Sequence, residues 1–202
     1  MWLTSELDSW LPQALGPGLF FFSKPGRDRL ISNWFIAAEP QNSLLRLLYE
    51  RLCEYWRKGR FNFSDNQRPS WVGLLERGLR RNAYLPRLWL RWPLRYSPAS
   101  PPYMIYHYMF AELVATDTQC AKIWEDMVKI PADLPHRLLR HGLLNPADHE
   151  FWGIVQDARP PVFKLNWKVA TTGVPEGSVL GEILRLQSLG ARVDGQKQSA
   201  SL

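Results

Sequence analysis

The sequence predicts a mixed α/β fold, and three observations support this. Two short segments, 19–22 and 30–38, are rich in apolar, aromatic and β-branched residues, which is typical of buried strands. Several longer segments place apolar residues at intervals of three and four, which is typical of helices that bury one face. The chain of 202 residues is 46% hydrophobic and 22% charged, so it can enclose a core. Strands that alternate with helices indicate an α/β domain, helix-rich with a few strands.

The elements are expected in a definite order along the chain. A short helix or turn over 7–15 precedes the two strands, and Asn42 or Ser43 then caps a helix that ends at Gly59. Later elements are expected to be helices over 103–115, 118–129, 133–141 and 146–152, a strand over 162–169, and a last helix over 176–189 that ends at Gly190. We therefore predict one domain over 1–190, followed by a disordered tail over 191–202.

Cysteine usage and the N-terminus limit the possible locations of the protein. Cys53 and Cys120 have no partner at metal-ligand spacing, which argues against a zinc module and a disulfide-rich secreted scaffold. The first basic residue is Lys24, so the charged start of a signal peptide is missing, and no apolar run has the length of a membrane span. These features predict a cytoplasmic protein that is soluble or peripheral on the inner face of the membrane.

The net charge of +6 is concentrated in one segment. Residues 57–95 hold ten basic and two acidic side chains, a segment charge of +8, whereas the rest of the chain carries −2. A helix over 71–82 would separate leucines from arginines, which is typical of helices that lie at a membrane interface. The alternatives are packing on the domain with solvated arginines and, last, nucleic-acid binding. The residues expected at the membrane surface are Trp71, Arg77, Arg80, Arg81, Arg87, Trp89, Arg91 and Trp92.

His107 lies on the apolar face of a predicted helix, because Phe110, Ala111 and Val114 follow it at three, four and seven positions. The favoured interpretation is a core histidine with one hydrogen-bond partner. The alternative is a metal or phosphate ligand at the inner edge of a cleft.

Two other patterns suggest polar ligands. On a strand, Lys164 and Lys168 share one face, and two ammonium groups there could hold a diphosphate; the alternative is an exposed strand face. Ser32 and Asn33 interrupt an apolar strand, where buried polar groups need hydrogen-bond partners, and this favours a site. The chain contains no Gly-rich phosphate loop, nucleophile elbow or HExxH pair.

Four segments, taken in chain order, resemble the capsular polysaccharide synthesis protein family. The segments are LTSELDSWLP at 3–12, ISNWFIAA at 31–38, YHYMF at 106–110 and KLNWK at 164–168. The family is similar to the wider group of DXD-containing sugar-nucleotide glycosyltransferases of GT-A type fold. The resemblance covers most of residues 3–185.

The resemblance implies transfer of a sugar from a nucleotide-diphosphate donor to a glycan or lipid-linked acceptor. It also implies a divalent metal, Mn or Mg, that bridges the diphosphate and the DXD carboxylates. Carried over by position, Lys164 and Lys168 hold the diphosphate, His107 lines the cleft or binds the metal, and Ser32 with Asn33 borders a sugar.

The chain departs from the family pattern in two places. It contains no DXD, which in the family precedes the segment matching 3–12 and would here fall upstream of Met1, together with the nucleotide-binding half. Pro102 stands where the family has an acidic residue, and the basic segment over 57–101 resembles an insertion. We expect this chain to be the C-terminal portion of a glycosyltransferase. Its incomplete sheet would expose an edge that can pair with a strand of a partner chain. The alternative is a basic, membrane-associated accessory module without catalysis.

Overall fold

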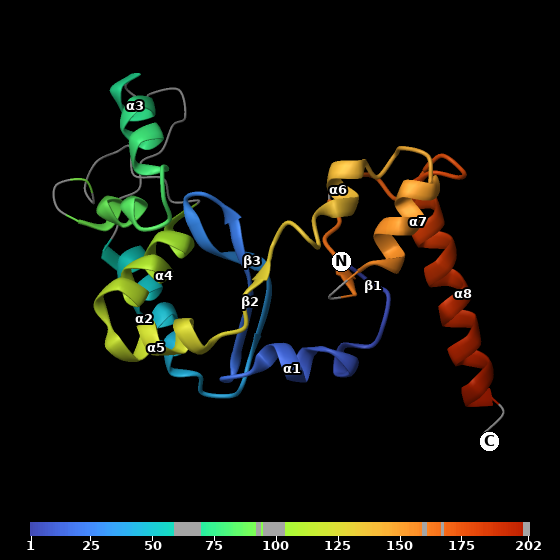
Figure 1. The fold of residues 1–202 in the computed structure, drawn as a ribbon, viewed down its shortest axis with the longest axis horizontal. Helices are drawn as coiled ribbons and strands as arrows, with labels where there is room; N and C mark the ends of the chain where they lie inside the picture. The colour runs from blue at the N-terminus through green and yellow to red at the C-terminus, as the bar shows by residue number, and fades with distance from the viewer. Residues whose placement is uncertain (59–69, 92–93, 95–103, 159–160, 167, 200–202) are drawn as a thin grey trace. The chain divides into compact units, whose positions relative to one another are not determined.

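The computed structural model describes residues 1–58, 70–91, 94, 104–158, 161–166 and 168–199 of the chain. They form a mixed α/β structure, as predicted. The chain divides into two compact units (Figure 1). Unit 1 combines Met1–Trp10 with Asp133–Leu202, and unit 2 is Leu11–Ala132.

Unit 2 is built on a three-stranded sheet. The strands are β2 (Leu19–Gly26), β3 (Arg29–Ala38) and β4 (Ile130–Pro131), in the order β3-β2-β4. β2 pairs antiparallel with β3 and parallel with β4. The predicted buried strand 19–22 is confirmed, since all four side chains are fully buried. The prediction for 30–38 holds only in part, because β3 is an edge strand and is buried only over residues 30–32.

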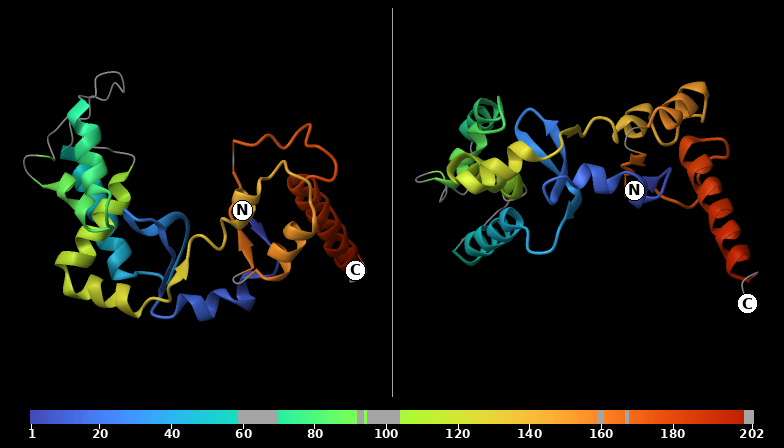
Figure 2. Two further views of the ribbon diagram at one scale, coloured as in Figure 1. Left: turned by 45° about the horizontal axis from the view of Figure 1, so that its top comes forward. Right: turned by 60° about the horizontal axis from the view of Figure 1, so that its bottom comes forward.

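Helices gather on one side of this hairpin in every view of the ribbon (Figures 1 and 2). They are α2 (Ser43–Lys58), α4 (Ile105–Thr116) and α5 (Thr118–Asp126), while the short α1 (Leu11–Leu15) leads into β2. The predicted cap of α2 is confirmed, because Asn42 Oδ1 accepts a hydrogen bond from the backbone N–H of Leu45 at 3.2 Å. The rings of Phe21 and Phe110 lie 5.5 Å apart and join the sheet to α4 in one core.

A second apolar cluster in unit 2 lies on α4. α3 (Ser70–Leu79) and η3 (Leu85–Leu90) contribute to it, and its buried members are Leu79, Trp89 and Tyr108. The contact of η3 with α4 therefore attaches part of the basic segment to the domain core.

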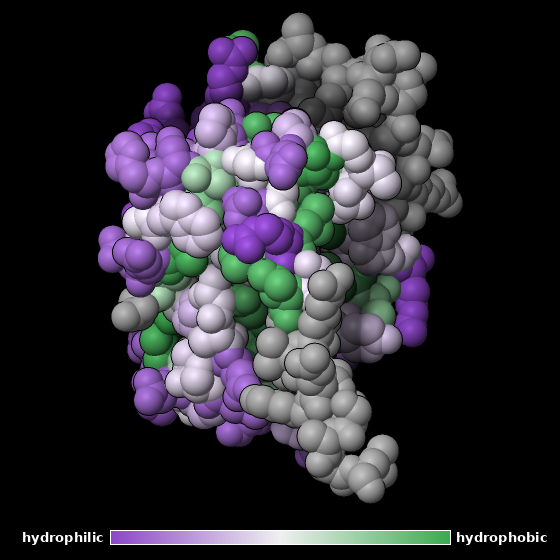
Figure 3. All heavy atoms as spheres, turned by 90° about the vertical axis from the view of Figure 1, so that its right-hand side faces the viewer, coloured by the Kyte–Doolittle hydropathy of each residue, from purple (hydrophilic) through white to green (hydrophobic). Residues whose placement is uncertain are grey.

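Unit 1 has its own core around a two-stranded pairing. β1 (Trp2–Leu3) pairs antiparallel with β5 (Val162–Phe163), and η1 (Leu7–Ser9) follows β1. The helices are α6 (Arg137–His141), α7 (His149–Gln156) and α8 (Val179–Ser199). The ring of Trp2 stacks on Phe163 at 5.5 Å and on Phe151 at 6.5 Å. On the face turned toward the viewer in Figure 3, hydrophobic side chains lie between hydrophilic ones.

Two predicted boundaries in unit 1 are wrong. The strand expected over 162–169 ends at Phe163, because β1 offers only two residues for pairing. α8 continues to Ser199, beyond the expected helix end at Gly190. Residues after 190 include Ala, Arg, Gln and Lys, which have high helix propensity, and each of the two glycines at 190 and 195 costs a helix only about 1 kcal/mol. Within the described parts of the chain, no helix has both the length and the apolar character needed to cross a bilayer.

Candidate functional site

His107 is buried in unit 2, where it joins α4 to β3. Its side chain is 4% exposed, and its ring hydrogen-bonds to the backbone of Ile31. Burial, assisted by the positive charge of Arg29, lowers the pKa of His107 to about 4, so the imidazole is neutral near pH 7. Nδ1 is buried without a hydrogen-bond partner among the described residues. This is the environment of the core histidine that the sequence favours.

The surroundings of His107 do not fit a divalent metal ion. Among the residues that the structure describes, no three His, Cys, Asp or Glu side chains come together. The charged groups that act on His107 are Arg29 and Asp28, and the positive charge of Arg29 would repel a cation. A hard cation needs several oxygen ligands, and the described residues place no such set around this ring. We therefore derive no metal-dependent step at His107.

Asp28, in the turn between β2 and β3, is the best-anchored charge of unit 2. Its side chain is 9% exposed, and its carboxylate accepts hydrogen bonds from Arg29 Nε at 3.2 Å and Arg80 Nε at 2.8 Å. Burial alone would raise the pKa of Asp28, but the hydrogen bond from Arg80 and the charge of Arg29 outweigh it and hold that pKa below its usual value. Sequence reasoning missed this residue, because its main partner lies 52 positions away.

Ser32 and Asn33 have different environments on β3. Ser32 is buried, and its Oγ has no hydrogen-bond partner within the described part of the chain. Asn33 is exposed, so the inference that its amide is buried in an apolar strand is wrong. Adjacent side chains on an edge strand point to opposite faces, which explains the difference. The structure thus brings Ser32 and His107 to one pair of packed elements, β3 and α4.

Lys164 and Lys168 belong to unit 1 and do not alternate along a strand. The N–H of Lys164 donates to the Pro135 carbonyl at 2.9 Å, just after β5 ends. The N–H of Lys168 donates to Asn166 Oδ1 at 3.0 Å, which makes a turn. The predicted shared strand face is therefore wrong, although a role for either lysine in binding a diphosphate stays a prediction.

The basic segment packs against the core of unit 2 more extensively than the sequence suggests. Trp89 is 0% exposed and packs with Leu79 and Tyr108, so its predicted place at a membrane surface is wrong. An amphipathic pattern identifies an apolar face, but protein atoms can cover that face as well as lipid. The side chains of Trp71 and Trp92 lie outside the described residues.

Three of the predicted surface arginines make ion pairs within unit 2. Arg80 binds Asp28, as described above, while Arg87 and Arg91 approach opposite oxygens of Glu112 at 3.8 and 2.9 Å. Arg77 donates to the carbonyl of Gly73 at 3.3 Å, and Arg81 is exposed. Arg77 and Arg81 thus remain the predicted arginines best placed to meet a membrane.

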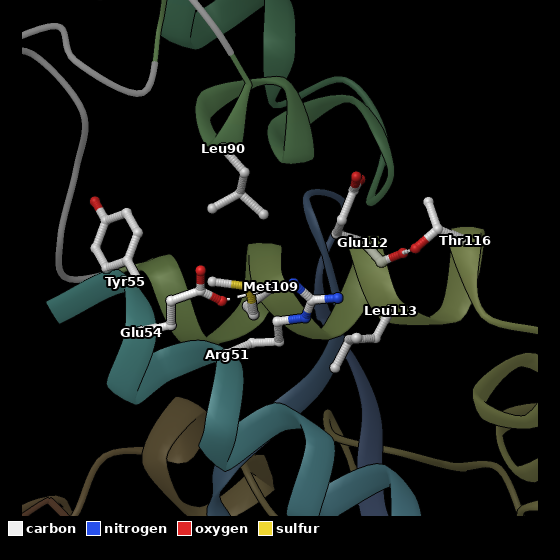
Figure 4. Close-up of a pocket in the computed structure, with 8 residues that line it drawn as sticks. All are labelled: Arg51, Glu54, Tyr55, Leu90, Met109, Glu112, Leu113 and Thr116. Carbon is white, nitrogen blue, oxygen red and sulfur yellow. Dashed lines mark hydrogen bonds and ion pairs between the residues drawn. The ribbon is translucent and has the colours of Figure 1, made fainter. Parts of the chain in front are cut away.

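A pocket of about 220 Å³ lies between α2, α4 and η3 (Figure 4). Arg51 and Glu54 of α2 form an ion pair at 3.6 Å at its edge, and Glu112 of α4 contributes a second carboxylate. Both carboxylates already neutralise arginines, so a ligand that needed them would have to break these pairs. The other residues that line the pocket are Tyr55, Leu90, Met109, Leu113 and Thr116. Sequence reasoning missed this pocket, since its residues come from three separate elements.

No family model, curated protein or solved structure matches this chain. The family resemblance therefore rests on the four segments at 3–12, 31–38, 106–110 and 164–168.

Proposed function

We propose that this chain is part of a glycosyltransferase of capsular or cell-surface polysaccharide synthesis, of GT-A type. The observation that carries the proposal is that two of the four segments of resemblance, 31–38 and 106–110, pack together in unit 2. In unit 2, segment 31–38 in β3 packs against segment 106–110 in α4. In unit 1, segment 3–12 begins in β1, which pairs with β5 directly before segment 164–168.

A specific contact joins the pair in unit 2, because His107 hydrogen-bonds to the backbone of Ile31. In unit 1, the N–H of Thr4 donates at 3.0 Å to the carbonyl of Pro161, which precedes segment 164–168 by three residues. The packing of segment 31–38 on segment 106–110 places these two segments of resemblance in one core, and this supports the proposal.

In this proposal the exposed amide of Asn33 on β3 borders a sugar, with the buried Ser32 next to it in the strand. Lys164 and Lys168 of unit 1 are separate candidates for binding a diphosphate. A divalent Mn or Mg ion would require carboxylates from an additional polypeptide segment, since the described residues offer no such set. The free side of β3 is the edge where a partner chain would extend the sheet, because β3 pairs only with β2 among the described strands.

We expect sugar transfer by this chain alone to be undetectable with Mn or Mg, because no DXD carboxylate holds the ion against the leaving diphosphate. The measurement is donor hydrolysis and transfer with a panel of nucleotide sugars, with metal and with chelator. Adding a polypeptide that supplies a DXD-containing, nucleotide-binding half is expected to produce turnover. In that mixture Asn33→Ala should lower turnover by about tenfold, the effect of one lost hydrogen bond.

Lys122→Ala is the matched control, because Lys122 is an exposed residue of α5 in the same unit. Metal-dependent turnover by this chain alone would contradict the proposed division of the enzyme. Absence of both nucleotide-sugar binding and turnover in the mixture would contradict the glycosyltransferase function and favour the accessory module.

The second candidate is that accessory module, a basic protein that associates with membranes without catalysis. One observation favours it: Leu74 on α3 is 67% exposed, and Arg77 lies one helical turn further along the same face. Leu85 and Leu88 of η3 are also exposed. Exposed leucines beside an exposed cation such as Arg77 suit the boundary between lipid headgroups and acyl chains.

We expect the protein to sediment with anionic vesicles at low salt and to be released at high salt. Each arginine near an anionic surface contributes about 1 kcal/mol, so Arg77→Ala/Arg81→Ala should weaken binding by roughly 30-fold. Arg87→Ala/Arg91→Ala is the matched control, because Glu112 already neutralises part of that charge. Equal binding to neutral and anionic vesicles, or none to either, would contradict the prediction.

A further inference from the structure

We propose that a pocket at the turn of the β2–β3 hairpin binds a phosphate group that carries an apolar substituent. This inference goes beyond the proposed function and does not depend on it. The pocket has a volume of about 520 Å³ and lies between the hairpin turn and the residues that follow α3. Its lining residues are Lys24, Gly26, Arg27, Arg29, Leu30, Asn82, Ala83 and Tyr84.

The pocket carries an excess of positive charge. Lys24 and Arg27 are exposed, and neither forms an ion pair with any described acid. Asp28 is the one acid in the turn sequence 24–29, and it is buried and bound by both Arg29 and Arg80. Its negative charge is therefore already matched, and the cations at the mouth of the pocket keep their attraction for an anion.

The hairpin turn positions these cations. Arg29 uses Nε to bind Asp28, so the terminal nitrogens of its guanidinium can still donate to another acceptor. That guanidinium lies across Gly26, where an added Cβ would come within 2.7 Å of Nη2. Lys24 has a φ of +50°, which is uncommon for a residue with a side chain, and it sits where the register of β2 and β3 shifts. Such strained residues gather at functional sites.

Part of the pocket lining is apolar. It consists of Leu30, Ala83 and the partly exposed ring of Tyr84. Asn82 Oδ1 accepts hydrogen bonds from the N–H groups of Tyr84 and Leu85 at 2.9 and 3.0 Å, which holds this wall in place. Guanidinium groups suit the geometry of phosphate oxygens, and the apolar wall suits a hydrocarbon or aromatic group. A soluble phosphate ester and the headgroup of an anionic lipid share this chemistry.

The test is calorimetric titration of the full chain with phenyl phosphate at low ionic strength. We expect Lys24→Ala/Arg27→Ala to weaken binding by about tenfold or more, since two charge-assisted contacts are lost. Gly26→Ala should also weaken it by displacing the Arg29 guanidinium. Tyr84→Ala should weaken the binding of phenyl phosphate but leave that of inorganic phosphate unchanged. Arg46→Ala/Lys122→Ala is the control, because it removes the same charge from exposed helix positions in unit 2.

The outcomes separate the two sources of the phosphate. Binding of phenyl phosphate that depends on Lys24 and Arg27 supports a soluble ester. Binding only to vesicles that contain phosphatidic acid, with the same dependence, supports a lipid headgroup. The proposal is overturned if neither probe binds, if the Lys24→Ala/Arg27→Ala variant binds as the unmodified chain does, or if the control variant loses as much affinity. Folding of each variant is checked by circular dichroism, so that a loss of affinity reports on the pocket.

Discussion

Trp89→Ala is expected to destabilise unit 2 by about 3–5 kcal/mol, the usual cost of deleting a buried tryptophan. Trp89 is fully buried against Leu79 and Tyr108, and its removal would leave a cavity where η3 meets α4. The measurement is the free energy of unfolding from urea denaturation, followed by a probe in unit 2. If Trp89 instead lay at a membrane surface, the variant would lose vesicle binding and keep its stability.

Leu88→Ala is the matched control for that experiment, because Leu88 neighbours Trp89 in η3 and is exposed. Exposed substitutions away from a core usually change stability by less than about 0.5 kcal/mol. Equal destabilisation by the two variants would contradict the assignment of Trp89 to the core.

Acidification from pH 6.5 to pH 4 is expected to cost unit 2 about 3 kcal/mol of stability through His107 alone. The pKa of His107 is about 4 in the folded protein, against 6.5 for an ordinary histidine. Between these two pH values His107 is protonated in the unfolded chain but neutral in the folded chain. The free energy of unfolding therefore falls as the pH falls through this window. Below pH 4 both states are protonated, and the effect levels off.

The variant that tests this is His107→Gln, which keeps an amide donor for the backbone of Ile31 but does not titrate. Its stability should change much less between pH 6.5 and 4, measured by hydrogen exchange of the α4 amides or by urea denaturation at each pH. His149→Gln is the control, because His149 is exposed and lies in unit 1. If the pH dependence persists in His107→Gln, another group causes it.

Several elements could be predicted from the sequence because their signals are local. The run of Leu and Phe over 19–22 is a buried strand, and the cap at Asn42 begins α2 one residue later, as expected. Apolar residues at intervals of three and four likewise predicted α4 and α5, and the predicted ends of both helices differ from the observed ends by a few residues at most. These signals depend on neighbouring residues alone, so they do not require knowledge of contacts with distant parts of the chain.

Other predictions failed where a distant partner decides the outcome. The segment 162–169 alternates well enough for a strand, but a strand needs a partner, and β1 provides two residues. Asn33 lies in an apolar run, yet it is exposed because β3 is the edge of its sheet. Neither the length of a partner strand nor a position at an edge is encoded in the local pattern.

The sequence by itself determined the mixed α/β class and the positions of most helices. It also determined the concentration of basic residues in 57–95 and the four segments of family resemblance. The tertiary structure alone decided that Trp89 is core, that Glu112 binds Arg87 and Arg91, and that the turn around Asp28 borders a basic pocket. The physical reason is that burial and ion pairing depend on groups far apart in sequence, whereas helix and strand propensity depends on neighbours.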